Sequence, residues 1–88
     1  MKTYTILIDP SDPERESYTL DYSFTDHKAA IEAAKDTIKD LRLGYDDHTE
    51  IITKTDNQGQ IVAFELWQYE DVFQTSVRIL TTNLIQKD

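Results

Sequence analysis

Residues 18–24, YTLDYSF, alternate apolar and polar side chains without interruption. The apolar positions of this stretch are Tyr18, Leu20, Tyr22 and Phe24. A period of two is typical of a strand with one buried face, because a helix would scatter the same positions around its axis. Residues 2–8, KTYTILI, repeat the pattern, and Pro10 and Pro13 lie between the two stretches. Since proline lacks an amide hydrogen and restricts the residue before it, residues 9–17 are predicted to be the loop of a hairpin.

The period changes after residue 25, where apolar residues recur at a spacing of three and four. They are Ala30, Ile31, Ala34, Ile38 and Leu41. This spacing predicts a helix with one apolar stripe, which we expect to lie on one face of the sheet. Thr25 or Asp26 is expected to cap its start. Gly44 is expected to end it in the left-handed conformation just after Leu43.

A second hairpin is predicted from residues 50–55 and 60–69, which flank the turn residues DNQG. Alternation in the longer strand separates two faces. Val62, Phe64 and Leu66 form the expected core face, and Ile61, Ala63, Glu65, Trp67 and Tyr69 form the other. Because Glu65 is charged, we expect the second set to stand on the open face of the sheet.

The C-terminal segment fits two patterns. Phe73, Val77, Leu80 and Leu84 follow helical spacing, whereas its β-branched residues favour a strand. We expect a helix over about residues 71–86. The predicted fold is therefore α+β, in one domain of residues 1–88: an antiparallel sheet of about four strands in the order β-β-α-β-β, then a C-terminal helix.

Charge and composition narrow the possible functions. The chain has 88 residues, a formal net charge of -8 and no cysteine. A reducing compartment is favoured, and because no segment has the layout of a signal peptide or a membrane span, we expect a cytoplasmic protein. The negative field opposes direct binding of nucleic acid or membrane and favours a basic protein surface as partner. Solubility alone is the alternative explanation for this acidity.

Acidic residues gather in two predicted loops, and aromatic residues stand on the open sheet face. The first loop contains Asp9, Asp12, Glu14 and Glu16, and the second contains Asp46, Asp47 and Glu50. Trp67 and Tyr69 are the residue types enriched at binding hot spots, and Glu65 beside them offers a charge to arginine or lysine. We therefore predict that these ten residues bind a partner. Two alternatives remain: the C-terminal segment covers Trp67 and Tyr69, or a second protomer does so in a homodimer.

An enzyme is not expected, because no serine has a nucleophile-elbow setting and the two glycines stand apart from any phosphate-binding loop. No cofactor or metal is predicted. The strongest alternative is a metal-dependent hydrolase or metal sensor that uses Asp46, His48 and Glu50, which are suitable ligand types. A solvated loop explains the same residues.

In size, absence of cysteine, excess of acids and sheet-plus-helix layout, the chain resembles small acidic proteins of phages and plasmids that block host defence, including anti-CRISPR proteins and nucleic-acid mimics. The resemblance implies an inhibitor that occupies a basic, nucleic-acid-binding surface of a partner protein such as a host defence complex. The residues it would use are those of the two acidic loops.

Overall fold

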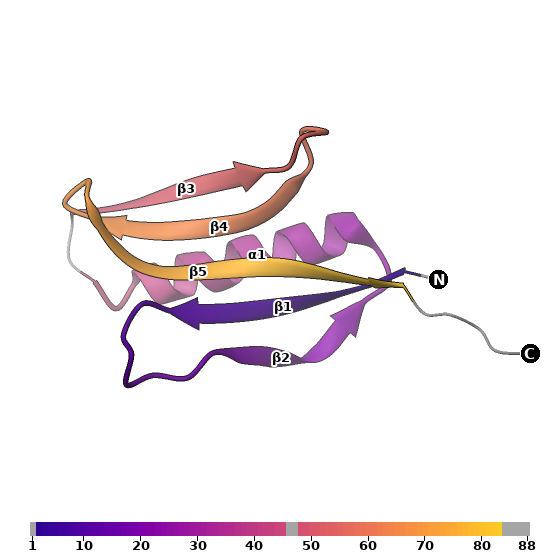
Figure 1. The fold of residues 1–88 in the computed structure, drawn as a ribbon, viewed down its shortest axis with the longest axis horizontal. Helices are drawn as coiled ribbons and strands as arrows, with labels where there is room; N and C mark the ends of the chain where they lie inside the picture. The colour runs from indigo at the N-terminus through magenta and orange to yellow at the C-terminus, as the bar shows by residue number, and fades with distance from the viewer. Residues whose placement is uncertain (1, 46–47, 84–88) are drawn as a thin grey trace, which may run out of the picture.

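The computed structural model describes residues 2–45 and 48–83, which form five strands and a helix (Figure 1). In chain order the elements are β1 (Lys2–Pro10), β2 (Tyr18–Phe24), α1 (His27–Arg42), β3 (Thr49–Thr55), β4 (Ile61–Gln68) and β5 (Val72–Asn83). The strands lie in one sheet in the order β2-β1-β5-β4-β3, and each neighbouring pair is antiparallel. The α+β class, both hairpins and the helix between them are confirmed.

The predicted C-terminal helix is wrong, because residues 72–83 form strand β5 in the centre of the sheet. Val77 and Ile79 are buried against the helix, while Arg78 and Leu80 between and beyond them are exposed. The alternation thus has period two, and Phe73 and Leu80 share helical spacing with Val77 only by coincidence. β5 pairs with β4 over Val72–Arg78 and with β1 over Thr75–Asn83, so its middle has a partner strand on each side, a position that β-branched residues favour.

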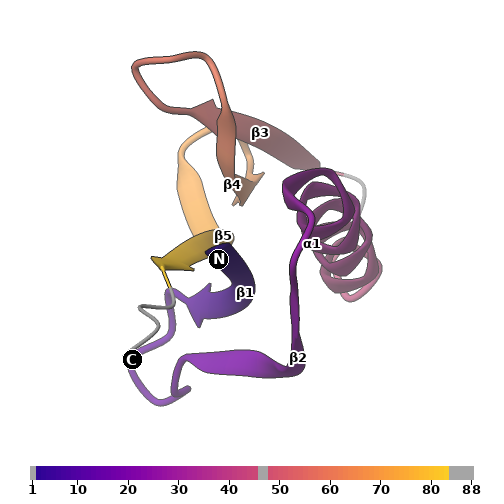
Figure 2. The same cartoon turned by 90° about the vertical axis from the view of Figure 1, so that its right-hand side faces the viewer.

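Helix α1 packs on one face of the sheet, which curves around it (Figure 2). Its contribution to the buried core is Ala30, Ala34 and Ile38, at a spacing of four. The sheet contributes Ile6, Ile8, Phe64, Leu66, Val77 and Ile79. Ile31 and Leu41 pack at the border of this cluster, so the predicted apolar stripe is confirmed.

The two ends of α1 differ in how well they were predicted. Asp26 is the N-cap, and its side chain accepts a hydrogen bond from the Lys28 amide at 3.2 Å. At the other end, Leu43 is the C-cap in right-handed conformation, and its amide donates to the Asp40 carbonyl at 3.2 Å. Gly44 does not adopt positive φ, so the predicted left-handed ending is wrong. A tightened last turn satisfies these carbonyls instead.

The β3–β4 hairpin confirms the turn at residues 56–59, where Gly59 has φ of 80°. A register shift follows between Lys54 and Thr55. As a result Ile61 packs against the core rather than standing on the open face as predicted, while Phe64 and Leu66 are buried as expected.

Within the described part of the chain, no helix is long and apolar enough to cross a membrane.

Candidate functional site

The fold brings the connections rich in acidic residues to one end of the sheet (Figure 1). The loop between β1 and β2 is held to the start of β5 by the Ser11 amide, which donates to the Gln74 carbonyl at 3.0 Å. The turn between β4 and β5 is held to the residue before β3 by the Tyr69 amide, which donates to the His48 carbonyl at 2.9 Å. We call this region the acidic end. Its described acidic residues are Asp9, Asp12, Glu14, Glu16, Glu50, Glu70 and Asp71.

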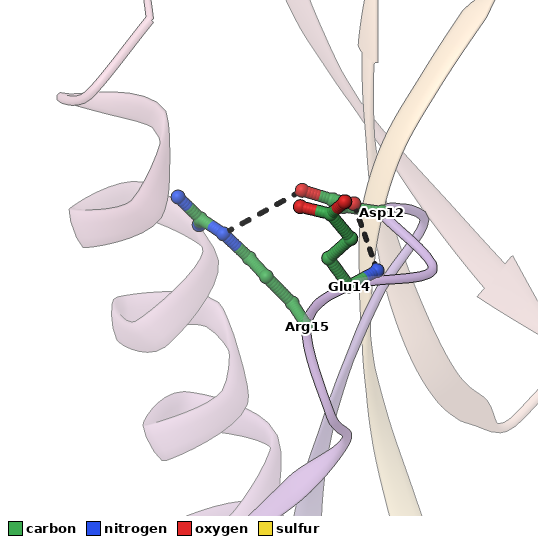
Figure 3. Close-up of polar contacts among 3 residues, drawn as sticks. All are labelled: Asp12, Glu14 and Arg15. Atoms are coloured by element: carbon green, nitrogen blue, oxygen red, sulfur yellow. Dashed lines mark hydrogen bonds and ion pairs between the residues drawn. The ribbon is translucent and has the colours of Figure 1, made fainter.

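Asp12 organises the loop between β1 and β2 (Figure 3). Its carboxylate accepts a hydrogen bond from the Glu14 amide at 2.9 Å, and its Oδ2 lies 3.9 Å from Nε of Arg15. The Asp12 carbonyl also accepts from the Arg15 amide at 3.0 Å. At the base of the loop, Asp9 accepts from the Ser17 hydroxyl at 2.6 Å. Two of the predicted binding residues therefore also shape the loop that carries them.

The other acidic side chains of this end are unused by the fold. The carboxylates of Glu14, Glu16, Glu50, Glu70 and Asp71 make no hydrogen bond or ion pair with any residue that the structure describes. Within the described part of the molecule, these charges are therefore not neutralised by a cation and do not accept hydrogen bonds from backbone amides. Asp46 and Asp47, which were also predicted to bind, lie outside the described residues.

Glu70 and Asp71 belong to a turn that the sequence pattern does not predict. Tyr69 and Glu70 have φ of 54° and 70°, a left-handed conformation that costs non-glycine residues free energy. Tyr69 is 54% exposed, and its ring stacks on His48 at a centroid distance of 5.0 Å. Both rings, with Thr49, Glu50 and Glu70, line an open hollow of about 420 Å³. A left-handed turn is usually recognised by a glycine, and because neither Tyr69 nor Glu70 is a glycine, the sequence contains no sign of this turn.

Trp67 stands on the sheet face opposite α1, as predicted, and is partly exposed. Its ring meets Phe73 edge to face at 5.5 Å. Residues 72–83 therefore do not fold over Trp67, since they form β5 beside it within the sheet; Leu84, also predicted to cover it, lies outside the described residues. Tyr69, by contrast, lies beyond the end of β4, in the turn, rather than on the strand as predicted.

Glu65 is engaged within the molecule. Its Oε1 accepts a hydrogen bond from Nε1 of Trp67 at 3.0 Å and lies 3.8 Å from Nζ of Lys54. The pairing orients the indole, and a partner cation would have to compete with Lys54 for the carboxylate. Glu65 therefore acts first as a support for Trp67.

The residues of the metal alternative are only partly described. His48 and Glu50 line the same hollow, but Asp46 lies outside the described residues. No group of three or more histidine, aspartate or glutamate side chains in residues 2–45 and 48–83 is arranged to hold a metal ion. The second histidine, His27, stacks on Tyr4 at 4.9 Å at the start of α1, the opposite end from His48.

No protein-family model, curated protein or solved structure matches this chain. The function proposed below therefore depends on the geometry and charge of the described residues alone.

Proposed function

We propose that this protein is a non-enzymatic binding module that docks its acidic end onto a basic surface of a partner protein. The observation that carries the proposal is the meeting of separate acidic connections at one end of the sheet, with several carboxylates unused by the fold. Opposite charges at such a surface accelerate and orient association more than they add affinity. A nucleic-acid-binding site of a host defence protein is one surface with the required charge.

The acidic end is held by hydrogen bonds within its loops and between segments far apart in the chain, which reduces the free-energy cost of binding. The loop between β1 and β2 is stiffened by two prolines and by the contacts of Asp12, and the turn at residues 69–71 is hydrogen-bonded to the residue before β3. Ordering a flexible loop on binding costs free energy, so a surface that is already ordered retains more of its interaction energy. Trp67 and Phe73, on the neighbouring open face, supply apolar area for the same contact.

The test is affinity capture from a cognate cell lysate at about 50 mM and about 500 mM salt, which changes the screening length from about 14 Å to about 4 Å. We expect a basic protein to bind at low salt and to be released at high salt. Its association rate is then measured with the double variant Glu14→Lys and Glu70→Lys. The matched control is Glu32→Lys with Asp36→Lys, which makes the same change in net charge on the exposed side of α1.

Association with the acidic-end variant should slow by about tenfold or more, while the helix variant slows much less, because steering depends on where the charge lies. Equal slowing by both variants would indicate an effect of net charge alone and contradict a docking surface. Salt-independent capture together with a dimeric mass in light scattering would favour the alternative, a homodimer closed through the open sheet face.

A further inference from the structure

A pocket lies where the end of α1 meets the loop between β1 and β2. It has a volume of about 300 Å³, at the lower end of the range of about 300–1,000 Å³ for small-ligand sites. Its lining residues come from the end of the helix and three strands or their connections: Ile8, Pro10, Arg15, Glu16, Tyr18, Leu41, Tyr45 and Thr75. A space of this size admits one side chain rather than a large substrate.

The interior of the pocket is apolar. Ile8 is buried at 1% exposure, and Leu41 and Tyr45 are half-buried against the core. The Thr75 hydroxyl already donates to the Asp9 carbonyl at 3.3 Å. An occupant must therefore carry a hydrocarbon portion to cover this surface, since a fully polar group would lose its water without gaining partners.

The rim carries an excess of negative charge. Glu16 lines the pocket, and Asp40 lines an adjoining hollow that shares Arg15, Leu41 and Tyr45. Neither carboxylate makes a hydrogen bond or ion pair with another described residue. The C-terminal end of α1 is at the same place, and its partial negative charge is offset by Lys39 and Arg42 in the last turn.

Arg15 is the opposing cation at this rim, and its charge is partly offset. Its Nε lies 3.9 Å from Asp12, which is outside the pocket lining, and Figure 3 shows the side chain reaching from the loop toward α1. Within the pocket lining Glu16 and Arg15 balance each other, and the nearby carboxylates of Asp40 and Asp12 make the surroundings of the rim negative. An incoming anion is disfavoured by this balance, and an incoming cation is favoured.

We propose that this pocket receives a single arginine side chain of the basic partner, an inference that rests on the proposed function and names its anchor. The methylene stem covers Ile8 and Leu41, while the guanidinium lies at the rim beside Glu16 and the aromatic surface of Tyr18 and Tyr45. Arginine suits the site because a planar, weakly hydrated cation stacks on aromatic rings and pairs with carboxylates. Buried anchors of this kind are frequent hot spots.

The direct test uses N-acetyl-arginine methylamide as probe, titrated to about 50 mM against the ¹⁵N-labelled protein, a range suited to a single-side-chain contact with millimolar affinity. We expect saturable shifts at the amides of Tyr18, Leu41 and Tyr45. The capped norleucine and capped glutamate analogues should bind more weakly. No saturable shift, equal binding of norleucine, or tighter binding of glutamate would overturn the proposal.

Two matched pairs of variants localise the site. Glu16→Gln should weaken the arginine probe by about two- to fivefold, whereas Glu14→Gln, in the same loop but outside the lining, should not. Tyr18→Ser should weaken it by a similar factor, about two- to fivefold, whereas Tyr22→Ser, on the same strand and similarly exposed, should not. Equal effects within each pair would overturn the assignment of the pocket.

The two proposals can fail separately. A basic partner that is captured in a salt-dependent way but binds the Glu16→Gln and Glu14→Gln variants equally would remove the arginine anchor and leave the docking function. Specific binding of the arginine probe without any partner that is captured in a salt-dependent way would support the arginine pocket and contradict the docking function.

Discussion

The two ends of the sheet use their acidic residues in opposite ways. At the end that holds the β3–β4 turn and the start of α1, Asp56 accepts from the amides of Gln58 and Gln60 at 2.8 and 3.0 Å, and Asp26 caps the helix. At the acidic end, most described carboxylates have no such partner. Carboxylates of the first kind stabilise local structure, and those of the second kind are available to another molecule. Stabilisation of the fold therefore explains the presence of Asp26 and Asp56, but it does not explain the carboxylates without partners at the acidic end.

Both ends depend on the same buried core, and removing part of it should have the largest effect. Ile38→Ala, at a fully buried position beneath the sheet, should lower the free energy of unfolding by about 2–5 kcal/mol. Leu43→Ala, at a position 83% exposed, is the matched control and should change it by less than about 0.5 kcal/mol. Urea denaturation measures both. Equal losses would mean that the helix does not pack as described.

The next largest effect should be a loss of stability when a carboxylate is removed from the end with the β3–β4 turn, but not when one is removed from the acidic end. Asp26→Ala removes the N-cap and should cost about 1 kcal/mol of unfolding free energy. Asp56→Ala leaves two turn amides without their acceptor and should cost about as much, about 1 kcal/mol. Glu14→Ala at the acidic end should cost less than about 0.5 kcal/mol in the same denaturation experiment. A loss for Glu14→Ala as large as for Asp26→Ala would break the distinction between the ends.

The smallest expected effect is on stability, and it tests whether the carboxylates of the acidic end serve the fold at all. Replacing Glu14, Glu16 and Glu70 together by glutamine should leave the free energy of unfolding unchanged or raise it by up to about 0.5 kcal/mol at low salt, because like charges at one end repel. The gain should fade at high salt, where these exposed charges are screened. Thermal melts at low and high salt measure it. Destabilisation by more than about 1 kcal/mol would show that these carboxylates serve the fold.

Short-range patterns were enough to predict most of the elements. The strands at residues 2–8 and 18–24, the stripe of α1 and the turn at residues 56–59 each depend on neighbours a few positions apart, and each is confirmed. The apolar face expected in residues 18–24 is buried only in part, because Tyr18 and Tyr22 are exposed. Strand β5 was missed because its period-two signal is mixed with a helical one. Its partners in β1 are more than 60 residues away, as in the pairs Ile6 with Ile79 and Ile8 with Val77. Pairing at that separation leaves no local mark on the sequence.

Several residues of the candidate site were predicted, but their position in space was not. Composition identified Asp12, Glu14 and Glu16, and alternation placed Trp67 on the open face. The register of the sheet decided that the loop after β1 and the turn after β4 lie at the same end. The pocket also arises from this meeting of distant segments, because Tyr45 and Tyr18 are brought together only by the packing of α1 on the sheet.

The sequence by itself determined most local conformations, the buried face of the helix and the excess of acidic charge, since these follow from side-chain period and residue type. Only the tertiary structure decided that the last strand joins the two hairpins, that Glu65 supports Trp67, and that the unused carboxylates share one end with a pocket. The physical reason is that strand pairing and charge proximity are set by contacts between segments far apart in the chain. Such contacts depend on how the whole core closes.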